Sequence, residues 1–308
     1  MGVDAADIVI LTGGTGGAKL ARGIADVAGA ERLAAIVNTG DDIEIYGAHV
    51  SPDPDLVSFW LADAIDARGW GLRDDTFAVM DALRELGVEV WFNLGDRDLA
   101  WCLERARMLA EGRSATAALT RLNEAIGVRS QVLPMSEDPV RTWVRTGSSG
   151  WCSFQEFMIR ERACGMIEGL EYRGAEQARA SEHALAAIAA ARTIVIGPSN
   201  PLASIGPILA VPAIREALLA SRAPIVAVSP IVGGEVLKGP TAAFMAFGAL
   251  DCTADGIADF YGELLDGIVA DEDVGRLTTL CADTRMDDAA SRARLAEQTL
   301  SFAQALAE

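Results

Sequence analysis

A glycine-rich segment near the N-terminus has the composition of a phosphate-binding loop. Residues 10–24, ILTGGTGGAKLARGI, place four glycines around Thr15, between an apolar run and a helical pattern. Glycine lets the backbone approach a ligand closely, and the unpaired N–H groups at the start of a helix attract anions. The segment therefore predicts a phosphate site formed by main-chain amides. The residues expected to form it are Thr12, Gly13, Gly14, Thr15, Gly16, Gly17 and Lys19.

This loop matches neither of two common nucleotide-binding patterns. A Walker A loop ends in Gly-Lys-Ser/Thr, whereas this chain has Ala18, Lys19 and Leu20 at those places. The dinucleotide pattern GxGxxG fails because Lys19 stands where the third glycine would be. That failure argues against a nicotinamide-dependent dehydrogenase. A tight turn that binds no ligand remains as the structural alternative.

An acidic cluster follows the next apolar run. Residues 38–56, NTGDDIEIYGAHVSPDPDL, contain Asp41, Asp42, Asp53 and Asp55. Because neighbouring parallel strands end at the same edge of a sheet, we expect this cluster beside the glycine loop. Loop carboxylates bind magnesium together with water and phosphate oxygens. The two segments thus predict a magnesium–phosphate site, with helix capping by Asp55 and solvated Asp41 and Asp42 as the alternatives.

Arginine and tryptophan are concentrated in two later segments, RGWGLRDDTF (68–77) and NLGDRDLAW (93–101). Guanidinium groups bind phosphate or ring oxygens, and an indole stacks on an aromatic ring. The candidates for these contacts are Arg68, Arg73 and Arg97, with Trp70 for the stacking. Salt-bridged loops are the alternative.

A further polar segment, GPSNPLASIG (197–206), follows another apolar run. Its Ser199 and Asn200 have side chains that can contact a base or a sugar edge. The alternative for both residues is an ordinary helix cap, with the residue before Pro201 restricted to extended backbone.

Composition excludes several classes of function. Lysine and arginine number 26 against 44 acidic residues, so the net charge of −18 repels nucleic acid and anionic lipid. No apolar run reaches the roughly 18 residues of a membrane span, and the first residues, MGVDAADIVILTGG, are a poor signal peptide. Two histidines make a histidine-ligated zinc site unexpected, and five scattered cysteines predict reduced thiols in the cytoplasm.

The elements that must position these residues follow an α/β pattern. Continuous apolar runs at 7–13, 33–40, 193–199, 224–230 and 266–271 are typical of parallel strands covered on both faces, and helical patterns separate them. Residues 56–126 are mostly helical, with a possible strand at 88–95, and residues 131–172 predict short strands of a small antiparallel lobe. The prolines of SPDPD predict an extended segment before a helix near Leu56.

We therefore predict an α/β fold with a doubly wound, mostly parallel sheet. Residues 1–55 and 190–308 are expected to form its nucleotide-binding core. Residues 56–189 are expected to form an inserted, mostly helical acceptor lobe with a small β section.

Taken in order, the marked segments resemble one protein family. TGGTGGAKLARGI, VNTGDD, SPDPDLVSF, WGLRDDTF, LGDRDLA, LPMSEDPVRT, FQEFMIR, GPSNPLASIGPIL and VSPIVGG look like the 2-phospho-L-lactate transferases of coenzyme F-420 biosynthesis, whose bacterial members are also described as phosphoenolpyruvyl transferases. The resemblance extends over about residues 8–240. It implies a Rossmann-like fold, dependence on Mg2+ and a homodimer.

The resemblance also implies a reaction. The donor is guanosine diphosphate esterified to a three-carbon acid, which is lactate, enolpyruvate or glycerate. The acceptor is the terminal ribityl hydroxyl of the deazaflavin Fo, and GMP leaves. Such chemistry depends on positioning and charge neutralisation more than on covalent catalysis.

Carried onto this sequence, the resemblance assigns roles to the marked residues. Asp42 and Asp53 are expected to be catalytic and to hold magnesium, with Asp53 taking or positioning the hydroxyl proton. Ser199 and Asn200 are expected beside the guanosine. The residues implied to face the deazaflavin are Asp55, Trp70, Arg73 and Arg97.

A related group of glycine-loop proteins supplies the rival interpretation. Its members bind nucleotide sugars and act in regulation without known catalysis. The segments GDRDLA and LPMSEDPV favour the transferase, because there the resemblance extends into the predicted acceptor lobe.

Overall fold

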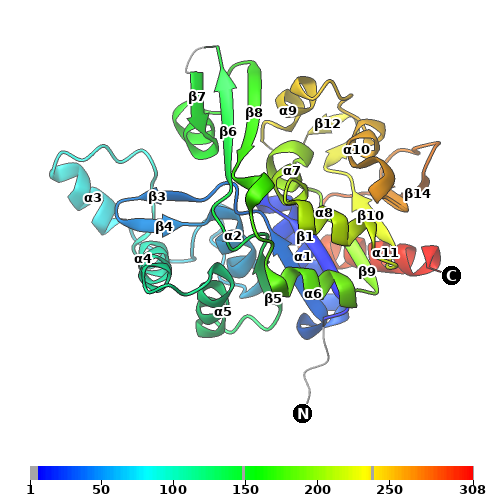
Figure 1. Cartoon of the computed structure of the whole chain (residues 1–308), viewed down its shortest axis with the longest axis horizontal. Coiled ribbons are helices and arrows are strands. Elements are labelled where there is room, and N and C mark those ends of the chain that lie inside the picture. Colours follow the sequence, from blue (N-terminus) through cyan, green and yellow to red (C-terminus); the bar gives the residue numbers. More distant parts are fainter. Residues whose placement is uncertain (1–5, 148–149, 237–238, 308) are drawn as a thin grey trace.

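The computed structural model describes residues 6–147, 150–236 and 239–307. The predicted nucleotide-binding core was expected to begin at residue 1 and to end at residue 308, and both of these ends lie outside the described residues. Within the described part, seven parallel strands form one central sheet in the order β14-β13-β10-β9-β1-β2-β5 (Figure 1). These strands are β1 (Ile8–Thr12), β2 (Leu33–Val37), β5 (Gln131–Pro134), β9 (Thr193–Ile196), β10 (Ile225–Val228), β13 (Gly267–Ala270) and β14 (Thr278–Cys281).

The predicted doubly wound α/β fold is confirmed. Numbered by their occurrence in this sheet, the strands follow the Rossmann order 3-2-1-4-5-6, with one further strand beyond the sixth. The chain leaves β1 toward β2 and later returns to β9 on the other side of β1. This reversal opens a crevice at the carboxyl ends of β1 and β9, where such folds bind ligands.

Both faces of the sheet are covered, which explains the continuous apolar runs. All five residues of β1 are buried, and their side chains alternate between two hydrophobic clusters. One cluster joins the sheet to α1 (Gly14–Ala28), α2 (Pro52–Leu61) and α11 (Ala289–Leu306). The other joins it to α6 (Glu182–Ala190), α7 (Gly206–Leu209), α8 (Pro212–Leu219) and α10 (Ala254–Tyr261).

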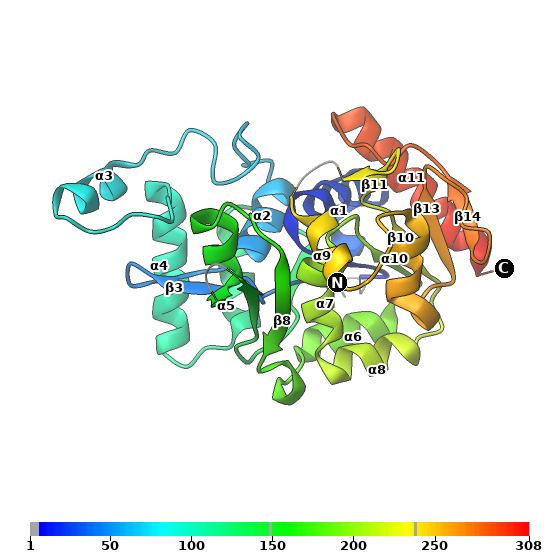
Figure 2. The same ribbon diagram turned by 90° about the horizontal axis from the view of Figure 1, so that it is seen from above.

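The helical part of the segment expected as an inserted lobe packs into a third hydrophobic cluster. It contains α3 (Ala78–Glu85), α4 (Asp96–Ala110) and α5 (Ala115–Ala125), which pack beside the hairpin of β3 (Ile43–Ile45) and β4 (Ala48–Val50). Figure 2 shows α3 projecting away from the central sheet. An antiparallel sheet of β7 (Gly150–Ser153), β6 (Arg141–Thr146) and β8 (Ile167–Arg173) follows.

Three local expectations were wrong. Residues 88–95 form no strand, because the chain there runs along the surface without a partner strand. Residues 131–134 do not belong to the small antiparallel lobe: as β5 they pair in parallel with β2 in the central sheet. The segment SPDPD is not extended, since α2 begins at Pro52, a position in the first helical turn that proline tolerates.

The remaining elements are short and connect the larger ones. Near the cavity described below lie η2 (Glu156–Arg160), η4 (Pro201–Ile205), α9 (Thr241–Phe247), β11 (Ile231–Val232) and β12 (Glu235–Val236). Elsewhere lie η1 (Ala30–Arg32), η3 (Ala175–Gln177) and η5 (Gly262–Leu264). Among the described residues no single helix is long and apolar enough to cross a membrane, while the bent pair 201–209 and 212–219 passes that test by length and composition only.

The C-terminal helix contributes to stability by covering α1 and the sheet. Leu295 on α11 is fully buried, so Leu295→Ala is expected to lower the free energy of unfolding by about 2–5 kcal/mol. Leu219 at the end of α8 is 44% exposed, and Leu219→Ala is the matched control, with a loss below about 1 kcal/mol. Urea denaturation of both variants measures the difference. Equal losses would contradict the packing of α11.

Candidate active site

A cavity of about 730 Å3 lies at the carboxyl ends of the central strands. The glycine loop forms one side of it, with Gly13, Gly14, Thr15, Gly16 and Lys19 in the lining. Segments that follow β2, β9, β10 and β14 form the other sides. The cavity is therefore at the crevice that the strand order predicts.

The glycine loop is tight because other backbone and side-chain atoms occupy the space of the missing Cβ atoms. A Cβ on Gly13 would collide with the carboxylate of Asp53, and one on Gly16 would collide with the carbonyl of Pro198. A Cβ on Gly17 would collide with the hydroxyl of Thr12. Gly17 and Thr12 are thus packed beneath the loop, while the preceding glycines face the cavity.

The helix that follows the loop points its first turn at the cavity. Gly14 is the first residue of α1 and has a φ of +64°, a conformation that favours glycine. Lys19, one turn further on, lines the cavity and donates from Nζ to the carbonyl of Met286 at 2.8 Å. The main-chain amides, the helix dipole and this ammonium group together make the surface attractive to phosphate.

Two buried carboxylates face the same cavity. The N–H of Gly14 donates to Oδ1 of Asp53 at 2.7 Å, and Nδ2 of Asn38 donates to Oδ2 of Asp53 at 2.9 Å. The same Nδ2 donates to Oδ1 of Asp41 at 2.9 Å. Burial raises the pKa of Asp53 to about 6, and burial together with the charge of Asp53 raises the pKa of Asp41.

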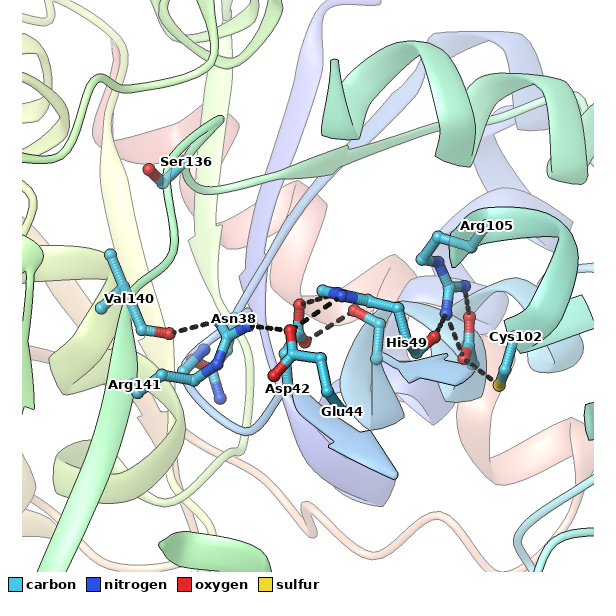
Figure 3. Close-up of polar contacts among 12 residues, drawn as sticks. Asn38, Asp42, Glu44, His49, Cys102, Arg105, Ser136, Val140 and Arg141 are labelled. Atoms are coloured by element: carbon cyan, nitrogen blue, oxygen red, sulfur yellow. Dashed lines mark hydrogen bonds and ion pairs between the residues drawn. The ribbon is translucent and has the colours of Figure 1, made fainter. Parts of the chain in front are cut away.

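The other predicted acid of this cluster, Asp42, points elsewhere. Its carboxylate accepts a hydrogen bond from Ser51 at 2.6 Å and lies 3.1 Å from Nε2 of His49. Figure 3 shows Asp42 beside His49. These residues line a second cavity of about 310 Å3, and Asp53 is not among its lining residues. The structure therefore joins Asp53 through Asn38 to Asp41, a member of the predicted acidic cluster, whereas the resemblance had selected Asp42. Two consecutive acids in a tight turn point in different directions, and the sequence pattern did not specify which one faces the loop.

The expected nucleotide-binding residues both line the larger cavity. The hydroxyl of Ser199 donates to the carbonyl of Gly13 at 2.7 Å, which ties the β9 loop to the glycine loop. The carbonyl oxygen of Asn200 caps η4 by accepting from the N–H groups of Leu202 and Ala203, both at 3.0 Å. Its Nδ2 is buried and has no partner among the described residues, so it remains available to a ligand.

The residues expected to face a deazaflavin are divided by the structure. Trp70 lines the cavity, and its ring lies 4.4 Å from the guanidinium of Arg68. Arg73 and Arg97 do not line it. Arg73 donates to the carbonyl of Asp63 at 2.8 Å, and Arg97 donates to the carbonyl of Arg73 at 3.1 Å, so both stabilise the loop itself.

Asp55 is an internal anchor. Both terminal nitrogens of the buried Arg105, labelled in Figure 3, bind its carboxylate. Nε1 of Trp101 also donates to it at 2.8 Å. Asp98 and Cys102 lie close enough to complete a metal-ligand set with Asp55. The guanidinium of Arg105 already neutralises this cluster, however, so we interpret it as an ion pair that fixes α2 to α4.

Sequence reasoning missed two parts of the cavity wall. Phe154, Gln155, Met158 and Ile159 come from the segment at η2, and residues 284–287 come from the loop before α11. The sequence analysis quoted FQEFMIR only as part of the family resemblance. In the structure this segment exposes apolar side chains such as Ile159, which is 39% exposed, and exposed apolar surface is typical of a ligand site. The loop at 284–287 gave no signal beyond its charge.

The sequence comparisons agree with this geometry. The family model described as 2-phospho-L-lactate transferase CofD matches residues 8–295. The chain belongs to this family. It is 38% identical over 266 aligned positions to the CofD-family protein of Methanosarcina mazei named 2-phospho-L-lactate transferase, covering 86% of this chain and 87% of that relative. It is 39% identical over 316 aligned positions to the phosphoenolpyruvate transferase of Streptomyces griseus, covering 96% and 98%.

A solved structure supports the fold of this CofD-family chain. The crystal structure of a UPF0052 family protein from Bacillus halodurans superimposes with a TM-score of 0.62 at 18% sequence identity. The alignment covers 96% of this chain and 98% of that one. At this identity the likeness applies to the fold alone.

Asp98, which lies beside the ion pair of Asp55 and Arg105, makes the stability of the protein depend on pH. Burial, and then the charge of Asp55, raises the pKa of Asp98 from 3.8 to about 7. The folded chain thus holds this proton more tightly than the unfolded chain, so ionisation lowers the free energy of unfolding as the pH rises from about 4 to 7. Asp98→Asn removes this cost, which is at most about 4 kcal/mol above pH 7 and nearly absent at pH 4. Urea denaturation across this pH range measures it.

Asp96 on the same helix is the matched control. Its carboxylate accepts hydrogen bonds from Thr76, Ala78 and Val79, which lower its pKa. Asp96→Asn is therefore expected to destabilise the protein at pH 7. A stabilisation by Asp98→Asn that does not vary with pH would contradict the assignment of a buried, reluctantly ionised carboxyl.

Proposed function

We propose that this protein transfers a phospho-acid from a guanosine diphosphate-linked donor to the terminal ribityl hydroxyl of the deazaflavin Fo, releasing GMP. The acid is 2-phospholactate, phosphoenolpyruvate or phosphoglycerate. The hydroxyl oxygen forms a bond to the phosphorus that carries the acid, and the bond from that phosphorus to the bridging oxygen of GMP breaks. The observation that carries the proposal is the CofD family match over residues 8–295, with a cavity where the glycine loop meets two buried carboxylates.

The chain supplies the binding groups for such a donor. The diphosphate would contact the amides of Thr15 and Gly16 in the first turn of α1 and the ammonium group of Lys19. The free Nδ2 of Asn200 would donate to the nucleoside beyond β9. Trp70 lines the opposite part of the cavity and offers an indole face to the planar ring of the acceptor.

Asp53 is the group placed to receive the acceptor's proton. Its pKa of about 6 leaves it mostly ionised at neutral pH, yet basic enough to act as a general base. The hydrogen bonds from Gly14 and Asn38 fix its orientation toward the cavity. The proton of the hydroxyl passes to this carboxylate as the new bond to phosphorus forms.

The carboxylates also fit a divalent cation. Asp41 and Asp53 are buried in the same cavity wall, and both accept a hydrogen bond from the neutral amide of Asn38. Two such carboxylates beside a phosphate surface match the oxygen ligands of Mg2+. We propose that Asp41 and Asp53 are the protein ligands of Mg2+. Asp42 lies in the adjoining turn and is not one of them. The bound ion would neutralise charge on the phosphoryl oxygens together with the ammonium group of Lys19.

Substitution of the three acids separates their roles. Asp53→Asn and Asp41→Asn are each expected to lower turnover by about 100-fold or more, because each removes a charge from the cavity. Asp42→Asn is expected to cost less than about tenfold, because its carboxylate lines the other cavity. GMP release from a guanylylated acid and Fo measures all three. Large losses for Asp42→Asn and Asp53→Asn, with little loss for Asp41→Asn, would favour the pairing expected from the sequence.

Mass spectrometry of the product with each of the three donors tests the reaction itself. The expected product is Fo joined through a phosphodiester to one of the acids, in amounts equal to the GMP released. Tight binding of a nucleotide sugar with no GMP release from any donor would instead favour the regulatory binding protein.

Removal of divalent metal provides an independent measurement. We expect EDTA to reduce GMP release to background and Mg2+ or Mn2+ to restore it, because oxygen ligands accept both ions. Zinc chelation is the control, since a chelator selective for zinc should leave turnover unchanged. Full activity in EDTA would contradict the magnesium part of the proposal.

A further inference from the structure

Asn38 lies at the centre of the carboxylate pair and has no role in the function proposed so far beyond its contact with Asp53. It follows β2 directly and is fully buried. Its backbone N–H donates to the carbonyl of Thr12 at 3.1 Å, which fixes it to the end of β1. Its side chain contacts Asp41 and Asp53 at the same distance, 2.9 Å.

The orientation of this amide is set from its other end. The N–H of Gly40 donates to Oδ1 of Asn38 at 2.7 Å, so the oxygen faces Gly40 and the NH2 group faces the carboxylates. The opposite orientation would place an amide oxygen against two carboxylates and an NH2 group against an N–H. An amide NH2 has two hydrogens, and here each has one carboxylate acceptor.

We infer that Asn38 is a positioning residue that holds Asp41 and Asp53 together as ligands for a divalent cation. One neutral donor binds one oxygen of each carboxylate, so a single amide keeps the two carboxylates side by side. A cationic residue in its place would compete with the metal, and an apolar residue would let the carboxylates separate. The inference rests on the magnesium part of the proposed function.

The hydrogen bonds fix which carboxylate oxygens face Asn38 and the glycine loop, while each oxygen keeps a further lone pair for a cation. Asn38 binds Oδ1 of Asp41 and Oδ2 of Asp53, and both acids line the larger cavity. Gly14 fixes the second oxygen of Asp53 by its N–H, so the distance between the glycine loop and the carboxylates is also fixed. Groups that orient metal ligands typically account for 10–100-fold in metal affinity.

Direct binding of Mn2+ tests this role without turnover. Mn2+ is titrated into the metal-free full chain, and the electron paramagnetic resonance signal of aqueous Mn2+ gives the free concentration. Asn38→Leu, which keeps the volume but removes both donors, is expected to raise the dissociation constant for Mn2+ by about 10–100-fold. Asn38→Ser is a smaller change for the fold. Its hydroxyl can donate to one carboxylate at most, so we expect it to weaken Mn2+ binding several-fold.

Asn123 on α5 provides the matched control. It is buried, neither of its side-chain polar atoms has a partner among the described residues, and it lies outside both cavities. Asn123→Leu is expected to leave the Mn2+ dissociation constant within about twofold of wild type. Circular dichroism tests whether each variant is folded. If Asn38→Leu does not fold, the Mn2+ affinity of Asn38→Ser decides the test.

The outcomes separate the inference from the reaction. Wild-type affinity for Mn2+ in the folded Asn38 variants overturns the positioning role, as does equal weakening by Asn123→Leu. A wild-type protein that binds no Mn2+ overturns both the inference and the magnesium part of the proposal. Normal Mn2+ binding that is weakened by Asn38→Leu, in a protein that releases no GMP, supports the inference and overturns the proposed reaction alone.

Discussion

Two carboxylates buried side by side are the constraint on which the ligand edge of this sheet depends. Burial removes hydration from Asp41 and Asp53 and raises the pKa of each, and the charge of Asp53 raises the pKa of Asp41 further. The fold offsets part of it with one amide, one main-chain N–H and the positive end of α1. Gly13 is part of the same arrangement, because any side chain there would displace the carboxylate of Asp53. The glycine loop and the acidic cluster are therefore one structural unit.

Two acids in the first turn of α2 have different environments. Asp53 faces the cavity, whereas Asp55, two residues later, binds Arg105 of α4 in the interior. A buried ion pair of this kind adds little net stability, but removing one partner is costly because the other charge stays buried. Its contribution is geometric: α4 holds the turn that aims Asp53. The helical lobe thus acts on the site through an anchor rather than through a ligand contact.

The sequence was most informative where periodicity and chain order determine structure. Continuous apolar runs predicted β1, β2, β9, β10 and β13, and the position of the glycine loop after β1 placed the cavity. It was least informative about the direction of individual polar side chains. Asp41 and Asp42 have the same chemistry and adjacent positions, and only the turn after β2 determines which faces the loop. Arg73 and Arg97 satisfy loop carbonyls, a use that composition does not distinguish from ligand binding.

The edge strand β5 has a consequence for the architecture of the chain. It pairs with β2, yet it is reached only after α2, α3, α4 and α5 have been traversed. Closing such a long loop is entropically unfavourable until the intervening helices are packed, so this edge should be among the later parts of the sheet to form. Excising the whole predicted insertion, residues 56–189, would therefore remove a border strand of the central sheet. Recombination between family members would have to exchange the central sheet and the helices that precede β5 together.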